Sequence, residues 1–139
     1  MARTAALMGD TGFLKDYNSN ISWSVEFARE NLPKFKYNEN QIQQVIQLLE
    51  KKGKANANSS HVEKIMADAE TVYYGRVDFI SLAENLFKEL NEMQIVSSRE
   101  GFIQRMSKTL SEHQYFTESA RRLVEIEIKD QLEQVKKLA

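Results

Sequence analysis

With 139 residues and 42% hydrophobic side chains, the chain is long enough for one domain with a real core, and we expect a single domain over residues 1–139. Its 19 Lys and Arg nearly balance 20 Asp and Glu, so the net charge of -1 gives no bulk field to attract nucleic acid or an anionic membrane. The lack of cysteine excludes disulfides and thiolate chemistry and, with no signal-peptide-like or membrane-spanning apolar run, predicts a soluble, cytoplasmic protein.

The first recognisable element is the segment 5–14, AALMGDTGFL, which predicts a short helix ending in a turn that carries Asp10 among apolar residues. A carboxylate removed from water is costly unless it gains hydrogen bonds, a cation or a metal. We therefore expect Asp10 to lie in a buried turn and to have a partner. One candidate is local, because an aspartate can accept hydrogen bonds from the backbone amides of Thr11 and Gly12 in an Asx turn.

The rest of the chain predicts an all-α fold of about six helices, because it holds a single proline, five glycines and apolar residues at helical spacing. Each predicted helix has an apolar stripe along one face. The predicted helices cover residues 21–32, 38–49, 60–73, 78–90, 97–110 and 117–138. Pro33 marks the end of the first of them and Gly75 the end of the third.

The starts of these helices are predicted by N-cap residues, three of which have a Glu or Gln three positions later, as in a capping box. The three pairs are Asn38 with Gln41, Ser60 with Glu63, and Ser97 with Glu100. Asp78 and Thr117 are expected to cap two more helices.

Four phrases in chain order, AALMGDTGFL, SVEFARENLPKF, EKIMADAETVYYGRVDF and HQYFTESARRL, resemble a branch of the HD superfamily of metal-dependent phosphohydrolases. The resemblance covers most of the chain. It implies a compact multi-helix HD-like domain over residues 1–139 that lacks the usual N-terminal helices. In that family a helix ends in a His-Asp doublet, and a later helix carries an Asp-Ala-Asp phrase.

This sequence departs from the family at the residues that hold the metal. Gly9 stands at the histidine of the doublet, and the doublet's aspartate is Asp10. Glu70 stands at the last carboxylate of the later phrase, where the family has a ligand, and Asp68 keeps the first. By resemblance, the residual metal ligands are Asp10 and Glu70. No catalytic or cofactor-binding residue is assigned and no cofactor is expected, the alternative being weakly held Mg²⁺ or Mn²⁺.

Helical geometry leaves open which acidic residue faces the former site. Asp68 and Glu70 are two positions apart, about 200° around the helix axis, so only one of them can face it. The other interpretation is that both are solvated or hydrogen-bonded flank residues. The two histidines, His61 and His113, fall outside the family motif positions, and we expect them at the surface or at helix termini.

The missing imidazoles predict a non-catalytic helical domain with an interaction or regulatory role. One alternative is a metal-dependent phosphohydrolase acting on a nucleotide or other phosphomonoester. A second is a module that binds a ligand without turnover. Apolar faces near Leu7, Phe13 and helix 21–32, which upstream helices cover in the family, predict a homo-oligomer, most simply a dimer, with another protein as the alternative partner.

Overall fold

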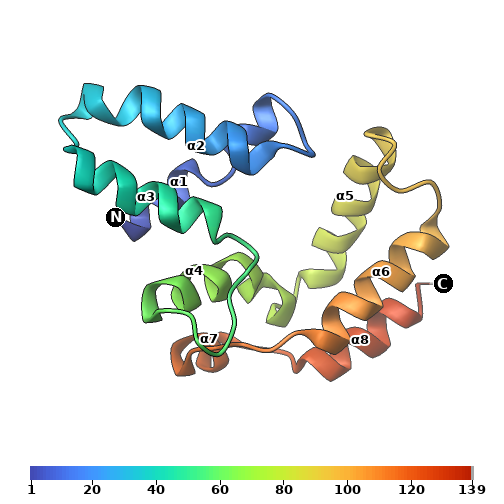
Figure 1. Ribbon diagram of the computed structural model, residues 1–139. Helices are drawn as coiled ribbons and strands as arrows, with labels where there is room; N and C mark the ends of the chain where they lie inside the picture. The colour runs from blue at the N-terminus through green and yellow to red at the C-terminus, as the bar shows by residue number, and fades with distance from the viewer. Residues whose placement is uncertain (139) are drawn as a thin grey trace. The chain divides into compact units, whose positions relative to one another are not determined.

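The computed structural model describes residues 1–138 and is all-α, as predicted (Figure 1). This range holds eight α-helices and three short 3-10 helices and no strand. In chain order they are α1 (Ala2–Met8), η1 (Thr11–Leu14), α2 (Asn20–Asn31), η2 (Leu32–Phe35), α3 (Glu39–Glu50), α4 (His61–Thr71), η3 (Val72–Gly75), α5 (Phe79–Glu92), α6 (Arg99–Glu112), α7 (Glu118–Leu123) and α8 (Ile128–Lys136). Within the same range, no helix is both long and apolar enough to cross a lipid bilayer.

The chain divides into two compact units, Met1–Ala67 and Asp68–Ala139, with the boundary inside α4. The first unit holds α1 to α3 and most of α4, and the second holds the last turn of α4 with η3 and α5 to α8. This division into two compact units does not decide whether residues 1–139 form a single domain, so the single domain stays a prediction.

The first unit is built on the antiparallel pair α2 and α3, against which α1 packs (Figure 1). Two fully buried alanines, Ala5 on α1 and Ala28 on α2, let the helices approach closely because a methyl group takes little space. The aliphatic side chains of this core are Leu32, Ile42, Val45, Ile46 and Leu49. A hydrogen bond of 2.8 Å between Thr4 Oγ1 and Tyr37 OH joins the start of α1 to the residue before the α3 cap.

The second unit is closed by its last helix, α8, which packs on α6, α5 and η3. Val135 on α8 is fully buried. Gln131 on the same helix is buried too, and its Nε2 donates to the Arg76 carbonyl at 2.6 Å. That bond satisfies one donor of a buried amide, which would otherwise be costly, and ties α8 to the turn after η3.

Three predicted helix starts are confirmed by their hydrogen bonds. The Asn38 side chain accepts from Gln41 N, while Gln41 Oε1 accepts from Asn38 N. The same reciprocal pair joins Ser60 and Glu63. Thr117 caps α7 by accepting from the amide of Ala120 at 3.2 Å.

Two other caps differ from the prediction. The residue that caps α6 is Ser98, not Ser97, and its hydroxyl accepts from Gly101 N. Asp78 does stand before α5, but its side chain caps no helix amide. It instead forms a bidentate pair with Arg76, because a guanidinium offers two donors in one plane.

The C-terminal helix predicted over residues 117–138 is wrong as one element, because it is broken into α7 and α8. At the break, the amides of Glu125 and Ile126 both donate to the carbonyl of Gly75, at 2.8 and 2.9 Å. Gly75 allows this approach, since a Cβ there would lie 3.0 Å from Val124 Cγ1. A tertiary hydrogen-bond pair therefore replaces the helical bonds that the local sequence favours.

A second glycine, Gly12, sets the approach of η1 to α2 in the first unit. A Cβ at this position would lie 1.7 Å from the carbonyl oxygen of Asn20, which is far inside van der Waals contact. The Gly12 amide also donates to the buried Oγ of Ser24 at 2.9 Å. The turn before α2 can thus take no side chain at this residue.

We expect Gly12→Ala to lower the free energy of unfolding by about 3 kcal/mol or more, because the turn must move off α2 and leave Ser24 without its donor. Gly53→Ala is the matched control. Gly53 has φ +69 with nothing near its Cβ position, so only backbone strain of about 1–2 kcal/mol applies. Urea unfolding followed by Trp23 fluorescence measures both, and equal losses would contradict the steric account.

Candidate functional site

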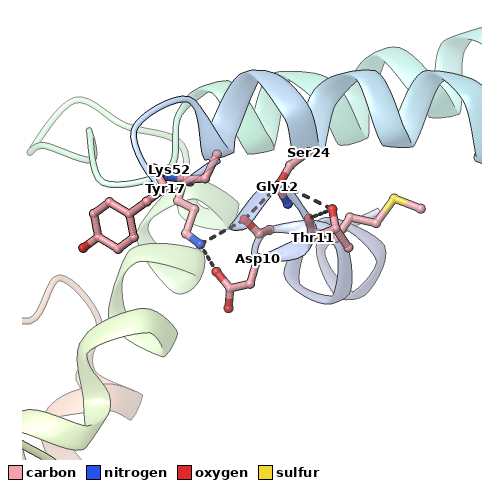
Figure 2. Close-up of polar contacts among 9 residues, drawn as sticks. Asp10, Thr11, Gly12, Tyr17, Ser24 and Lys52 are labelled. Atoms are coloured by element: carbon pink, nitrogen blue, oxygen red, sulfur yellow. Dashed lines mark hydrogen bonds and ion pairs between the residues drawn. The ribbon is translucent and has the colours of Figure 1, made fainter. Parts of the chain in front are cut away.

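The turn after α1 brings Asp10 together with a lysine from the end of α3 (Figure 2). The Nζ of Lys52 bonds to Oδ1 of Asp10 and also donates to the carbonyl of Gly9 at 3.2 Å. The same ammonium lies 5.8 Å from the centroid of the Phe13 ring. A cation near an aromatic ring and at the carbonyl end of a helix is favoured on both counts.

Asp10 itself is exposed, which corrects the expectation that it lies in a buried turn. Its side chain is 75% exposed, whereas that of Lys52 is only 20% exposed. The Asx turn is also wrong, because the Gly12 amide donates to Ser24 and the Asp10 side chain caps no amide of η1. Asp10 has a partner, as we expected, but the partner is the ammonium of Lys52, which is 42 positions away in the sequence.

Ser24 on α2 fixes the shape of this turn from the other side. Its hydroxyl is fully buried, accepts from Gly12 N and donates to Gly9 O at 3.3 Å. Thr11 adds a 3.4 Å hydrogen bond to the same hydroxyl and donates to the Met8 carbonyl at 2.8 Å (Figure 2). The Gly9 carbonyl therefore accepts from both Ser24 and Lys52.

Gly9 lies directly beside the lysine ammonium. Its backbone is ordinary right-handed helix, with φ -59, so a residue with a side chain is allowed there. A Cβ at Gly9 would lie 3.3 Å from the Ala5 carbonyl and 3.4 Å from Lys52 Nζ. The histidine of the family's doublet would consequently begin beside the ammonium.

The donor set at Asp10 does not fit the metal that the resemblance implies. The carboxylate already bonds to a positive charge, and the neighbouring ligand position is a glycine. Among residues 1–138, no group of three or more His, Asp or Glu side chains is placed to hold a metal ion. Glu70 is half-buried on α4 within the second unit, while Asp10 belongs to the first, so their pairing around a metal stays a prediction.

Asp68 is the acidic residue whose role the sequence did not reveal. It is 3% exposed and accepts three hydrogen bonds: Phe116 N at 2.8 Å on Oδ1, and Thr117 N at 2.8 Å and Thr117 Oγ1 at 2.7 Å on Oδ2. The Thr117 hydroxyl therefore donates to Asp68 while accepting from the first turn of α7. A hydrogen-bonded flank residue was one of the two interpretations, and for Asp68 it is confirmed.

His113 follows α6 directly, at a helix terminus as expected, but it is not a simple surface residue. Its ring meets Tyr115 edge-on at 4.4 Å between centroids and Tyr74 at 5.0 Å. Among the residues described, its buried Nε2 has no hydrogen-bond partner. Burial lowers the pKa of His113, and the negative charge of Asp68 offsets part of that shift. His61, the first residue of α4, is exposed as predicted.

Two tyrosines of the second unit have raised pKa values. Burial raises the pKa of Tyr73 strongly, with a further contribution from Tyr74, which lies 4.6 Å away between ring centroids. Burial also raises the pKa of Tyr115, whose hydroxyl donates to the Thr71 carbonyl at 3.1 Å. The Tyr115 ring packs against His113, and the Tyr73 ring packs against Tyr74 and Phe79.

Comparison with known proteins finds no matching family model, no matching curated protein and no matching solved structure. The likeness to the HD superfamily therefore depends on the chain's own phrases.

The two aspartates allow a matched test of this geometry. We expect Asp68→Asn to lower the free energy of unfolding by about 2–4 kcal/mol. The NH₂ group of the asparagine would replace one acceptor oxygen and face the donors of Phe116 or Thr117, which would lose their acceptor. Asp10→Asn removes an exposed ion pair, and we expect a loss below about 1 kcal/mol. Denaturant unfolding at neutral pH measures both losses. Similar losses for the two variants would contradict the assignment of the structural role to Asp68.

Proposed function

We propose that the chain is a degenerate, non-catalytic HD-like domain in which Lys52 takes the place of the metal cation at Asp10. The observation that carries the proposal is the contact of Lys52 Nζ with the Asp10 carboxylate and the Gly9 carbonyl. An ammonium in this place neutralises the carboxylate and holds the turn. Unlike a bound metal, it offers no open coordination position to a substrate.

The chemistry of lysine supports this reading. A metal ion lowers the pKa of a bound water, whereas an ammonium, which donates to the Gly9 carbonyl and the Asp10 carboxylate, has no coordination position for a water. The family's imidazole, which would help to hold such a metal, is replaced by Gly9. A phosphohydrolase acting on a nucleotide or other phosphomonoester, the alternative, requires Lys52 to leave Asp10 and a metal to enter.

Metal content and hydrolysis separate the two functions. We expect the purified protein to hold far less than one transition-metal ion per chain after dialysis and to hydrolyse phosphomonoesters no faster than buffer alone. About one Mn, Fe, Ni or Zn per chain by elemental analysis, or hydrolysis above that control, would support the enzyme instead.

Restoring the family's histidine tests the place of Lys52. We expect Gly9→His alone to gain little metal affinity, because the imidazole begins beside the ammonium. Combined with Lys52→Met, it should bind Mn²⁺ or Zn²⁺ about tenfold or more tightly than either single variant, since a second ligand is added and a positive charge removed. Titration calorimetry measures this. Lys54→Met replaces a nearby lysine that bonds to the Glu50 carbonyl, and it is the matched control for Lys52→Met.

The interaction role that we propose is pairing with a second copy of this chain through α1 and η1. These two elements pack on each other and present Leu7 at 83%, Leu14 at 92% and Phe13 at 42% exposure. Exposed apolar groups of this size are typical of association surfaces. The basic Lys15 and the acidic Asp16 follow directly, so the surface has charges of both signs and can face itself without like-charge repulsion.

Leu14→Ser tests the pairing. In a two-fold dimer the leucine is buried in both copies, and at about 1.5–3 kcal/mol for each burial the variant should weaken the dimer by about a hundredfold or more. Sedimentation velocity at micromolar concentration measures the dissociation constant. Leu123→Ser, at an exposed leucine of the second unit, should leave it unchanged. A wild-type monomer, or equal weakening by both variants, would contradict a dimer through α1 and η1.

A further inference from the structure

Residues 113–117 join α6 to α7 and are held against α4 and η3 by one set of tertiary bonds. Asp68 accepts from the amides of Phe116 and Thr117 and from the Thr117 hydroxyl. Tyr115 OH donates to the Thr71 carbonyl. These groups all belong to the second unit.

His113 is the first residue of this segment and the one whose polar atom is left unsatisfied. The imidazole lies between Tyr74 of η3 and Tyr115 of the segment, with edge-on contacts to both. Because Nε2 is buried with no acceptor among the described residues, a proton placed there would have no hydrogen-bond partner. The closed segment is therefore built around the neutral ring.

The titratable groups that face the ring come from three elements. Asp68 of α4 attracts the proton, but its two oxygens are already occupied by three donors of the segment. Tyr74 of η3 and Tyr115 of the segment contact the His113 ring edge-on. The Tyr73 ring contacts that of Tyr74, with 4.6 Å between the centroids. Burial outweighs the charge of Asp68, so the pKa of His113 is lowered overall.

We propose that His113 is an acid-sensitive release for residues 113–117. When the ring takes up a proton it leaves the tyrosine pair, and the bonds of Phe116 and Thr117 to Asp68 open with it. The release frees the N-cap of α7 and exposes Tyr115. This inference goes beyond the proposed function and does not depend on it, because Asp10 and Lys52 lie in the other unit.

The sign of the pH dependence follows from the two states of the ring. An open segment exposes His113 at its ordinary pKa of about 6.5, while the closed segment lowers that pKa. The open state then binds more protons, so closure is favoured above about pH 6.5 and weakens as the pH falls through the interval between the two values. Aspartate ordinarily titrates near pH 4, so a range of about pH 7.5 to 5.5 separates the titration of histidine from that of the carboxylates.

Two measurements on the wild-type chain test the release. An NMR titration of the imidazole protons should give His113 a lower pKa than the exposed His61, which serves as the internal reference. Hydrogen exchange, expressed as protection factors at each pH, should show the amides of Phe116 and Thr117 losing protection between pH 7.5 and 5.5. The Gly12 amide, which is bonded to Ser24 in the other unit, should not follow.

Replacement of the ring links the two readouts. His113→Phe keeps an aromatic ring between the tyrosines and removes the titration, so the loss of protection at Phe116 and Thr117 should disappear. His61→Gln, at the chain's other histidine, should retain the wild-type profile. A pKa of His113 at or above that of His61, protection that is constant with pH, or a loss that persists in His113→Phe would each overturn the proposal. The first two outcomes need no variant, so they decide the matter even if His113→Phe folds poorly.

Discussion

The buried hydroxyl of Ser24 is the interaction on which the arrangement at Asp10 depends. It bonds to Gly12 N and Gly9 O, and so holds the end of α1 against α2. From the other side, Lys52 at the end of α3 reaches the same Gly9 carbonyl and the Asp10 carboxylate. The polar groups of the turn thus bond to the Ser24 hydroxyl of α2 and to the Lys52 ammonium, two residues after the end of α3. The protein itself supplies the positive charge beside Asp10.

The two aspartates from the HD-like phrases show how tertiary position separates residues with similar local patterns. Asp10 is exposed and paired with a lysine, whereas Asp68 is buried and binds the backbone of a distant segment. Both stand beside apolar residues near a helix end, so periodicity alone gave no basis for choosing between these roles. A signal for Asp68 did exist in Thr117, because a capping hydroxyl that accepts from a helix amide can still donate to a carboxylate.

Helix starts were predictable at Asn38, Ser60 and Thr117, where the partner lies within three residues, and the start of α6 was predicted one residue too early. They were not predictable where a nearby competitor intervened, as when Arg76 took the carboxylate of Asp78. The break between α7 and α8 could not be predicted from the local sequence. It depends on two amides bonding to the carbonyl of Gly75, about fifty positions earlier in the chain, and no local propensity reports such a contact.

Lys52 shows the same limit at the candidate site. As one of two lysines after a predicted helix, it has the position of a residue that stabilises the C-terminus of its own helix. In the structure its Nζ donates to the Gly9 carbonyl at the C-terminal end of α1, and the two residues are 43 positions apart in the sequence. A Cβ at Gly9 would lie 3.4 Å from Lys52 Nζ, so the glycine and the ammonium are immediate neighbours. A turn that is held by the protein's own ammonium needs no bound metal to neutralise its carboxylate.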